Sequence, residues 1–210
     1  MYTTADTHAV AQYQTIFREF SHFNQVQSEV LPDILNTDHP IVVASPTGSG
    51  KTVLFELAIV RLLEKMQSSV VDFKMVYVAP IKALCSERYR DWVDKFSPLG
   101  VKVVEVTGDM EGQDVEEIRS NNLIITTPEK WDAVSRWLSL TDPHLISSLR
   151  LVLIDEVHLL NDKDRGHVLE AVVCRLKTLG CPARYVGVSA TFPNVEDIAF
   201  WRVCVCLLQV

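Results

Sequence analysis

The sequence predicts an α/β fold in which a mostly parallel sheet is covered by helices on both faces. Two patterns support this prediction. Short apolar runs alternate with longer helical patterns along the chain, which is typical of strands joined by crossover helices. The runs are also continuously apolar instead of alternating with polar residues, which indicates strands buried on both faces of a parallel sheet.

Each element follows from a local pattern. Strands are expected at residues 41–44, 74–79, 101–106, 122–126, 151–154 and 185–188. Helices are expected at residues 52–66, 83–96, 128–138 and 168–179. The first of these helices is apolar on nearly every face, so a buried position is predicted for it. Thr127 is expected to cap the third helix, with Pro128 in its first turn.

Composition limits the possible classes of protein. The chain has 210 residues, of which 48% are hydrophobic and 22% charged, as expected for one globular domain with a sizeable core. The net charge of -7 means that any nucleic-acid contact must come from a local patch. No apolar run reaches the ~20 residues of a membrane span, so no membrane association is expected. The five cysteines lack zinc-site spacing and indicate reduced thiols in an intracellular protein.

A glycine-containing loop lies between the strand at 41–44 and the helix at 52–66. Its residues are Ser45, Pro46, Thr47, Gly48, Ser49, Gly50, Lys51 and Thr52. Glycines let the backbone approach phosphates closely, and the N–H groups of the helix start attract anions. Lys51 can place a cation on the outer phosphates, and the Thr52 hydroxyl can ligate Mg²⁺. The pattern predicts a site for a nucleoside triphosphate, although Ser45 stands where glycine or alanine is usual.

Two carboxylates follow the apolar strand at 151–154. Asp155 can hold Mg²⁺, and Glu156 can orient the attacking water and accept its proton. Ligands of open α/β sheets bind at the carboxyl ends of the strands, where both residues are expected. Ser189, Ala190 and Thr191 follow another strand, and their hydroxyls are expected to reach the same carboxylates.

Taken together, these motifs resemble the first RecA-like domain of a superfamily-two DExH-box helicase of the Ski-like branch, a P-loop NTPase fold. Residues 45–52 resemble motif I, 79–84 motif Ia, 127–130 motif Ib, 155–158 motif II and 189–191 motif III. The run at 127–132 is similar to a signature of the larger members of that branch, and the run at 155–166 most resembles the member that promotes meiotic crossing over. A P-loop kinase or transporter ATPase is disfavoured by motifs II and III.

The resemblance implies roles for further residues. ATP and Mg²⁺ are the expected cofactors, and the Gln27 amide would recognise the adenine edge. Pro80, Lys82, Thr127 and Pro128 would line the track of a single nucleic-acid strand, with DNA favoured over RNA, and a helix start can indeed bind a backbone phosphate. Coupling to other parts of the motor would involve three residues: His158, Ser189 and Thr191. A nuclear location is also implied. Trp131 and Trp137 could stack on bases, but core packing is favoured.

The expected organisation is a flexible lead-in at residues 1–16, the ATP-binding domain at 17–202 and a divergent tail at 203–210. In the family a second RecA-like domain completes the motor with arginines, and such contacts contribute ~10³–10⁵ in turnover. By itself this chain is expected to bind ATP weakly, hydrolyse it very slowly and not unwind. Two alternatives stay open: a fragment that binds ATP or nucleic acid without turnover, and an RNA helicase domain of the same branch.

Overall fold

The computed structural model describes residues 13, 15–19, 21–67, 72–109, 111–190 and 206–209. The chain divides into two compact units. The first unit comprises Met1–Val71 and Arg184–Val210, and the second comprises Asp72–Ala183. None of the described helices is both long and apolar enough to span a membrane.

The first unit is built around a parallel strand triplet. Its elements are α2 (Gln25–Asn36), β1 (Ile41–Ala44), α3 (Thr52–Met66), β6 (Arg184–Ser189) and β7 (Cys206–Gln209). β1 lies in the middle and pairs in parallel with β6 on one side and β7 on the other. α2 packs against α3, whose apolar residues are mostly buried, as the sequence predicts.

A single arginine fastens the end of α2 to β6. The Arg184 guanidinium donates to the carbonyl oxygens of Ile34 at 2.7 Å, Asp33 at 3.0 Å and His39 at 3.0 Å. These carbonyls include groups that a helix end leaves without partners. Burial lowers the pKa of Arg184 to about 10. The contact anchors α2, which carries residues that touch the phosphate loop.

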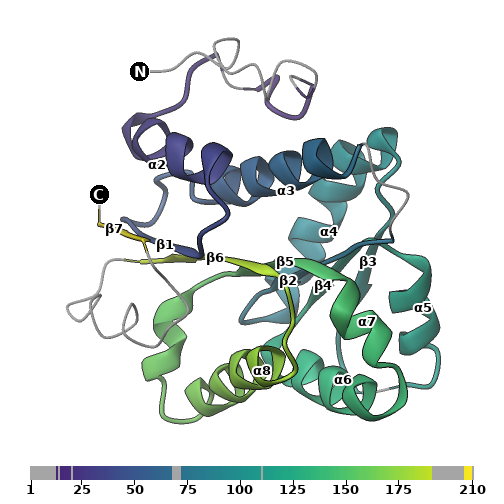
Figure 1. The fold of residues 1–210 in the computed structure, drawn as a ribbon. Coiled ribbons are helices and arrows are strands. Elements are labelled where there is room, and N and C mark those ends of the chain that lie inside the picture. Colours follow the sequence, from purple (N-terminus) through teal and green to yellow (C-terminus); the bar gives the residue numbers. More distant parts are fainter. Residues whose placement is uncertain are drawn as a thin grey trace. The chain divides into compact units, whose positions relative to one another are not determined.

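The second unit is a four-stranded parallel sheet in the order β3-β4-β2-β5. The strands are β2 (Lys74–Val78), β3 (Val103–Val106), β4 (Leu123–Thr126) and β5 (Leu149–Ile154). α4 lies on one face, and α6 and α8 lie on the other (Figure 1). The helical elements are α4 (Lys82–Phe96), η1 (Ser97–Leu99), α5 (Asp114–Ser120), α6 (Pro128–Thr141), α7 (Pro143–Ser148), η2 (Val157–Asn161) and α8 (Gly166–Thr178).

Large aromatic side chains fill the interior of this second unit. Tyr77, Trp92 and Phe96 are fully buried. The Tyr77 and Trp92 rings meet edge to face with centroids 4.9 Å apart, a favoured aromatic geometry. Trp131 is also buried, which confirms core packing for it, whereas Trp137 is 38% exposed and the core prediction for it is wrong.

The predicted strands and helices all occur, with ends shifted by up to three residues. α2, α5, α7 and β7 were not among the predicted elements. Within the expected lead-in, Tyr13 and Ile16 are buried, because their apolar side chains pack into the first unit. Within the expected divergent tail, Cys206–Gln209 forms β7 and pairs with β1, since this run supplies a strand-length β-forming segment.

Candidate functional site

The phosphate loop lies in the first unit, between the end of β1 at Ala44 and the start of α3 at Thr52. Gly48 and Gly50 have φ angles of +83° and +72°, which a side chain would strain. A Cβ atom on Gly50 would stand 2.5 Å from Gln27 Nε2, so a side chain there would displace the Gln27 amide. The loop therefore has the close-packed glycine backbone that the sequence predicts.

Two residues at the start of α2 hold this loop from outside. Gln27 Nε2 donates to the Gly50 carbonyl at 3.1 Å, and Asn24 Nδ2 donates to the Ser49 carbonyl at 2.9 Å. Asn24 and Gln27 also cap each other, since each side-chain oxygen accepts from the other residue's backbone N–H. Gln27 is 3% exposed, and this amide braces the loop. Its recognition of adenine stays a prediction, with one Nε2 hydrogen not used by the brace.

Lys51 lies against the loop that it follows. Its ammonium donates to the carbonyls of Ser45 at 2.9 Å and Pro46 at 3.0 Å. The Ser45 and Ser49 hydroxyls lie 2.7 Å apart, so the serine that replaces the usual glycine or alanine helps to close the turn. The Ser45 N–H donates to the Ser189 carbonyl at 3.1 Å. Motif III therefore begins beside motif I, while Thr191 lies outside the described residues.

The loop offers the kinds of hydrogen-bond donors and the positive charge that bind a triphosphate. Lys51 supplies a cation, the start of α3 supplies backbone N–H groups, and Thr52 lies half-buried in the first turn with a hydroxyl. Thr47 and Gly48 are exposed and leave the backbone open to a ligand. The predicted roles of Lys51 and Thr52 have the required chemistry at the required place in the fold.

Asp155 follows directly after β5 in the second unit. Its Oδ2 accepts from the Tyr77 hydroxyl at 2.7 Å, and its Oδ1 accepts from the Glu156 N–H at 2.9 Å. Burial is the largest influence on the Asp155 pKa and raises it, the Tyr77 hydrogen bond lowers it, and the Glu156 charge raises it. Each oxygen keeps lone-pair capacity, so this fixed carboxylate can accept Mg²⁺ or a magnesium-bound water.

The backbone turns sharply at Glu156. Its φ and ψ are both 52°, and it is the single non-glycine residue with positive φ in the described part of the chain. Such a left-handed conformation is unfavourable for glutamate and is often found at functional sites. It ends the alternation of side-chain directions that would otherwise send Asp155 and Glu156 to opposite faces. His158 Nδ1 lies 3.2 Å from Glu156 Oε2, which links two of the predicted site residues.

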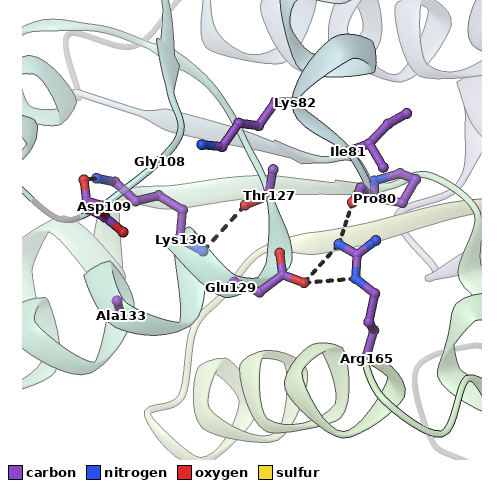
Figure 2. Close-up of a pocket in the computed structure, with 10 residues that line it drawn as sticks. All are labelled: Pro80, Ile81, Lys82, Gly108, Asp109, Thr127, Glu129, Lys130, Ala133 and Arg165. Atoms are coloured by element: carbon purple, nitrogen blue, oxygen red, sulfur yellow. Dashed lines mark hydrogen bonds and ion pairs between the residues drawn. The ribbon is translucent and has the colours of Figure 1, made fainter.

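A pocket of about 510 Å³ lies in the second unit (Figure 2). It is formed where β2, β3 and β4 end, by the starts of α4 and α6 and the turn before α8. Pro80, Lys82 and Thr127 line it, so three of the four predicted nucleic-acid residues lie together, whereas Pro128 is buried and is not part of the lining. The other lining residues are Ile81, Gly108, Asp109, Glu129, Lys130, Ala133 and Arg165.

The cationic side chains of this pocket differ in whether they form ion pairs with neighbouring carboxylates. Lys130 is buried against Asp114 at 2.6 Å, and Arg165 pairs with Glu129 at 2.7 Å. Lys82 has no hydrogen bond or ion pair within the described ranges, and its side chain is exposed at the start of α4. Lys82 is therefore a cation of the pocket lining that is available to an incoming anion.

The start of α6 offers fewer donors than the sequence suggests. Thr127 Oγ1 caps the Lys130 N–H at 3.4 Å, which confirms Thr127 as the N-cap. Pro128 has no N–H. Among the described residues, Glu129 is the one in this first turn whose N–H is left for a ligand. The donors that a phosphate could use at the start of α6 are therefore one backbone N–H and the Thr127 hydroxyl, with Lys82 nearby.

Sequence reasoning missed the residues that support these sites. Tyr77 and Arg165 were not singled out for a role, and Asn24 was noted only beside Gln27 in the resemblance to an adenine-recognising motif, although each touches a predicted site residue or lines the pocket. For Asn24, the signal was present as an Asn three residues before Gln27, the spacing of a capping box. The contacts of Tyr77 and Arg165 join segments 78 and 85 residues apart, and no local pattern reveals them.

Comparison with known proteins places the chain in a family. The family model described as DEAD/DEAH box helicase matches residues 24–198. The chain is 49% identical over 220 residues to "Probable ATP-dependent DNA helicase HFM1" of Mus musculus, with 97% of this chain and 15% of the relative covered. It is 42% identical over 190 residues to "ATP-dependent DNA helicase MER3" of Saccharomyces cerevisiae, covering 90% of this chain and 16% of the relative.

The chain thus spans less than a fifth of the length of these relatives. Its fold is similar to that of the DUF1998 helicase MrfA, solved bound to DNA and AMPPNP. The TM-score is 0.77 at 19% identity, with 100% of this chain and 29% of that chain covered, so this likeness concerns the fold alone. The match to the family model extends over most of the chain and includes the phosphate loop and both carboxylates. This chain belongs to the DEAD/DEAH box helicase family.

Proposed function

We propose that the chain is the ATP-binding motor domain of an ATP-dependent DNA helicase and uses ATP hydrolysis for movement along one nucleic-acid strand. The observation that carries the proposal is the phosphate loop, with positive φ at Gly48 and Gly50 and Lys51 folded onto it. A triphosphate would exchange the carbonyl partners of Lys51 for phosphate oxygens, which are stronger acceptors for an ammonium.

The proposed hydrolysis divides its tasks among few residues. Lys51 and the loop N–H groups would hold the outer phosphates, and Thr52 and Asp155 would supply oxygen ligands to Mg²⁺. When bound, Mg²⁺ neutralises charge that develops on the phosphates. Glu156 orients the attacking water and accepts its proton. Tyr77 and the Glu156 N–H keep Asp155 in one orientation, so the metal-binding carboxylate needs no rearrangement.

The nucleic-acid strand is assigned to the pocket of the second unit. Lys82, the Thr127 hydroxyl and the Glu129 N–H converge on it and can bind backbone phosphate without reading bases. DNA is preferred because the relatives are named as DNA helicases. A role in meiotic recombination and a nuclear location follow from the same resemblance. An RNA helicase domain of the same branch is the alternative, and competition between matched single-stranded DNA and RNA for the chain separates the two.

The experiment for the nucleotide site is a titration of the purified chain with a fluorescent ATP analogue in the presence of Mg²⁺. Saturable binding that Lys51→Ala weakens by at least about tenfold, the effect of losing one charge-assisted contact, supports the proposal. Wild-type binding that Lys51→Ala leaves unchanged would reject it. Thermal unfolding of both proteins verifies that the variant is folded.

A further inference from the structure

We propose that Arg165 is a positioning residue for nucleic-acid binding, because it clamps Glu129 of α6 to the backbone at Pro80. This inference rests on the proposed nucleic-acid pocket. Figure 2 shows the guanidinium between the Pro80 carbonyl and the Glu129 carboxylate. The Nε and Nη2 atoms donate to Glu129 Oε1 at 2.9 and 2.7 Å, and Nη2 also donates to the Pro80 carbonyl oxygen.

The clamp joins three separate segments of the second unit. Pro80 lies in the loop between β2 and α4, Glu129 lies in the first turn of α6, and Arg165 directly precedes α8. A planar guanidinium holds such partners in a fixed geometry, which the single ammonium of a lysine does not. Lys82 begins α4 two residues after Pro80, so the clamp sets the place of a pocket cation that is available to a phosphate.

The turn at residues 162–166, which carries Arg165, is fixed by hydrogen bonds to Asp162 and by close packing at Gly166. Asp162 Oδ1 accepts from the Asp164 N–H at 2.9 Å and from the Arg165 N–H at 3.0 Å. A Cβ atom on Gly166 would lie 2.2 Å from the Leu160 carbonyl oxygen, so a side chain is excluded there. Residues 162–166 thus form a shaped turn with Arg165 at its end. The turn begins six residues after Glu156, close in sequence to the hydrolytic carboxylates.

The opposite side of the pocket is held by the next residue of α6. The Lys130 side chain is 1% exposed, and its ammonium contacts Asp114 Oδ2 at 2.6 Å and the Asp109 carbonyl oxygen. The neighbours Glu129 and Lys130 therefore connect α6 to both adjoining segments, one through Arg165 and one through Asp114. Neither residue offers an unpaired cation to a phosphate, and both define the space in which one fits.

An alternative role for Arg165 is direct contact with the phosphate. The charge of Glu129 distinguishes the two roles. A carboxylate in a phosphate-binding pocket repels the ligand, so its removal strengthens binding if Glu129 does nothing else. If Glu129 holds the clamp, Glu129→Gln replaces a charge-assisted contact with a weaker neutral one, so the tie between Arg165 and α6 loosens and binding weakens despite the lost repulsion. The two roles predict opposite signs for Glu129→Gln.

The experiment measures binding of fluorescein-labelled oligo(dT) to the full 210-residue chain by anisotropy over a series of NaCl concentrations. For Arg165→Ala, Arg165→Lys and Glu129→Gln we expect affinity losses of similar size, on the order of tenfold. The double variant Arg165→Ala/Glu129→Gln should bind no more weakly than either single variant. Arg165→Ala should keep the wild-type salt slope, whereas Lys82→Ala should reduce it by about one.

A second readout needs no nucleic acid. The N–H groups of Leu84 and Cys85 donate to the Ile81 carbonyl at 3.1 and 3.2 Å, at the start of α4. Amide hydrogen exchange at these two N–H groups should accelerate in Arg165→Ala and Glu129→Gln, because the Arg165 contact that holds the backbone at Pro80 is lost or weakened. If Arg165→Ala does not fold, Glu129→Gln and Arg165→Lys still decide the question.

Three results would each overturn the positioning role. They are tighter oligo(dT) binding by Glu129→Gln, wild-type affinity in Arg165→Lys, and a reduced salt slope in Arg165→Ala. Failure of the wild-type chain to bind oligo(dT), or a Lys82→Ala variant that binds like wild type, would instead reject the proposed pocket, and the clamp with it. The two failures are therefore distinguishable by the wild-type and Lys82→Ala measurements.

Discussion

The Tyr77 hydroxyl donates a hydrogen bond of 2.7 Å to Asp155 Oδ2, so a buried tyrosine of β2 fixes the carboxylate that follows β5. Tyr77→Phe removes this bond and keeps the ring that packs on Trp92. The buried carboxylate then lacks one partner, and we expect a loss of about 1–3 kcal/mol in unfolding free energy. Chemical denaturation measures the loss.

The same variant should require more Mg²⁺ for binding of the ATP analogue, because Asp155 is no longer held in one orientation. Tyr89→Phe is the matched control, since the Tyr89 hydroxyl has no hydrogen-bond partner among the described residues. Equal stability and equal Mg²⁺ dependence for Tyr77→Phe and Tyr89→Phe would show that the Tyr77 bond has no such role.

Gly48 and Gly50 provide a matched pair in the phosphate loop. Both have positive φ, but a Cβ atom on Gly48 meets nothing within 4 Å, whereas one on Gly50 would displace the Gln27 amide. Gly48→Ala should cost only backbone strain, about 1 kcal/mol in unfolding free energy. Gly50→Ala should cost clearly more, because the brace from α2 is lost as well. Urea denaturation of the two variants checks this, and an equal cost for both would argue against the brace.

The buried pair of Lys130 and Asp114 should dominate the stability of the pocket. The side chains are 1% and 9% exposed, so Lys130→Met leaves a carboxylate uncompensated and should cost about 3–5 kcal/mol. Arg119→Ala, which breaks the more exposed pair with Asp142, should cost less than about 1 kcal/mol. Denaturant unfolding compares them. The double variant Lys130→Met/Asp114→Leu should regain most of the loss, and no recovery would contradict an electrostatic cause.

Cys85 should make stability fall at alkaline pH. Burial, followed by the Glu105 charge, raises the pKa of this thiol from 9.0 to about 12. Between these values the unfolded chain has lost the thiol proton and the folded chain keeps it, so the unfolding free energy decreases as pH rises. Unfolding measured at pH 8 and pH 10 should show a larger decrease for wild type than for Cys85→Ala. Identical decreases would mean that the thiol proton is not retained.

The main elements could be predicted because their signals are local. The apolar run at β1 and the apolar helix α3 were predicted with the bounds that the structure shows. α2 was missed because Pro32 interrupts its pattern, although Asn24 and Gln27 carry a capping box. α5 and α7 have seven and six residues and are too short for a clear helical period.

The supporting contacts could not be predicted because they join distant segments. The sequence identified Lys51, Asp155 and Lys82 by motif, but the brace from Gln27 to Gly50 and the bond from Tyr77 to Asp155 depend on tertiary packing. The exposure of Trp137 was also not predictable from the sequence. Its helix is amphipathic, with Trp131 and Leu138 on the buried face, and Trp137 lies off that face and is 38% exposed, which the residue type alone does not reveal.

The most direct test of the motor proposal is phosphate release by the purified chain with ATP and Mg²⁺, with and without single-stranded DNA. We predict slow release that DNA stimulates and that both Lys51→Ala and Glu156→Gln abolish, while Glu156→Gln still binds the ATP analogue. Analogue and DNA binding without any release in the wild-type chain would contradict a motor and support a binding module. Release that persists in Lys51→Ala would contradict the assignment of the phosphate loop itself.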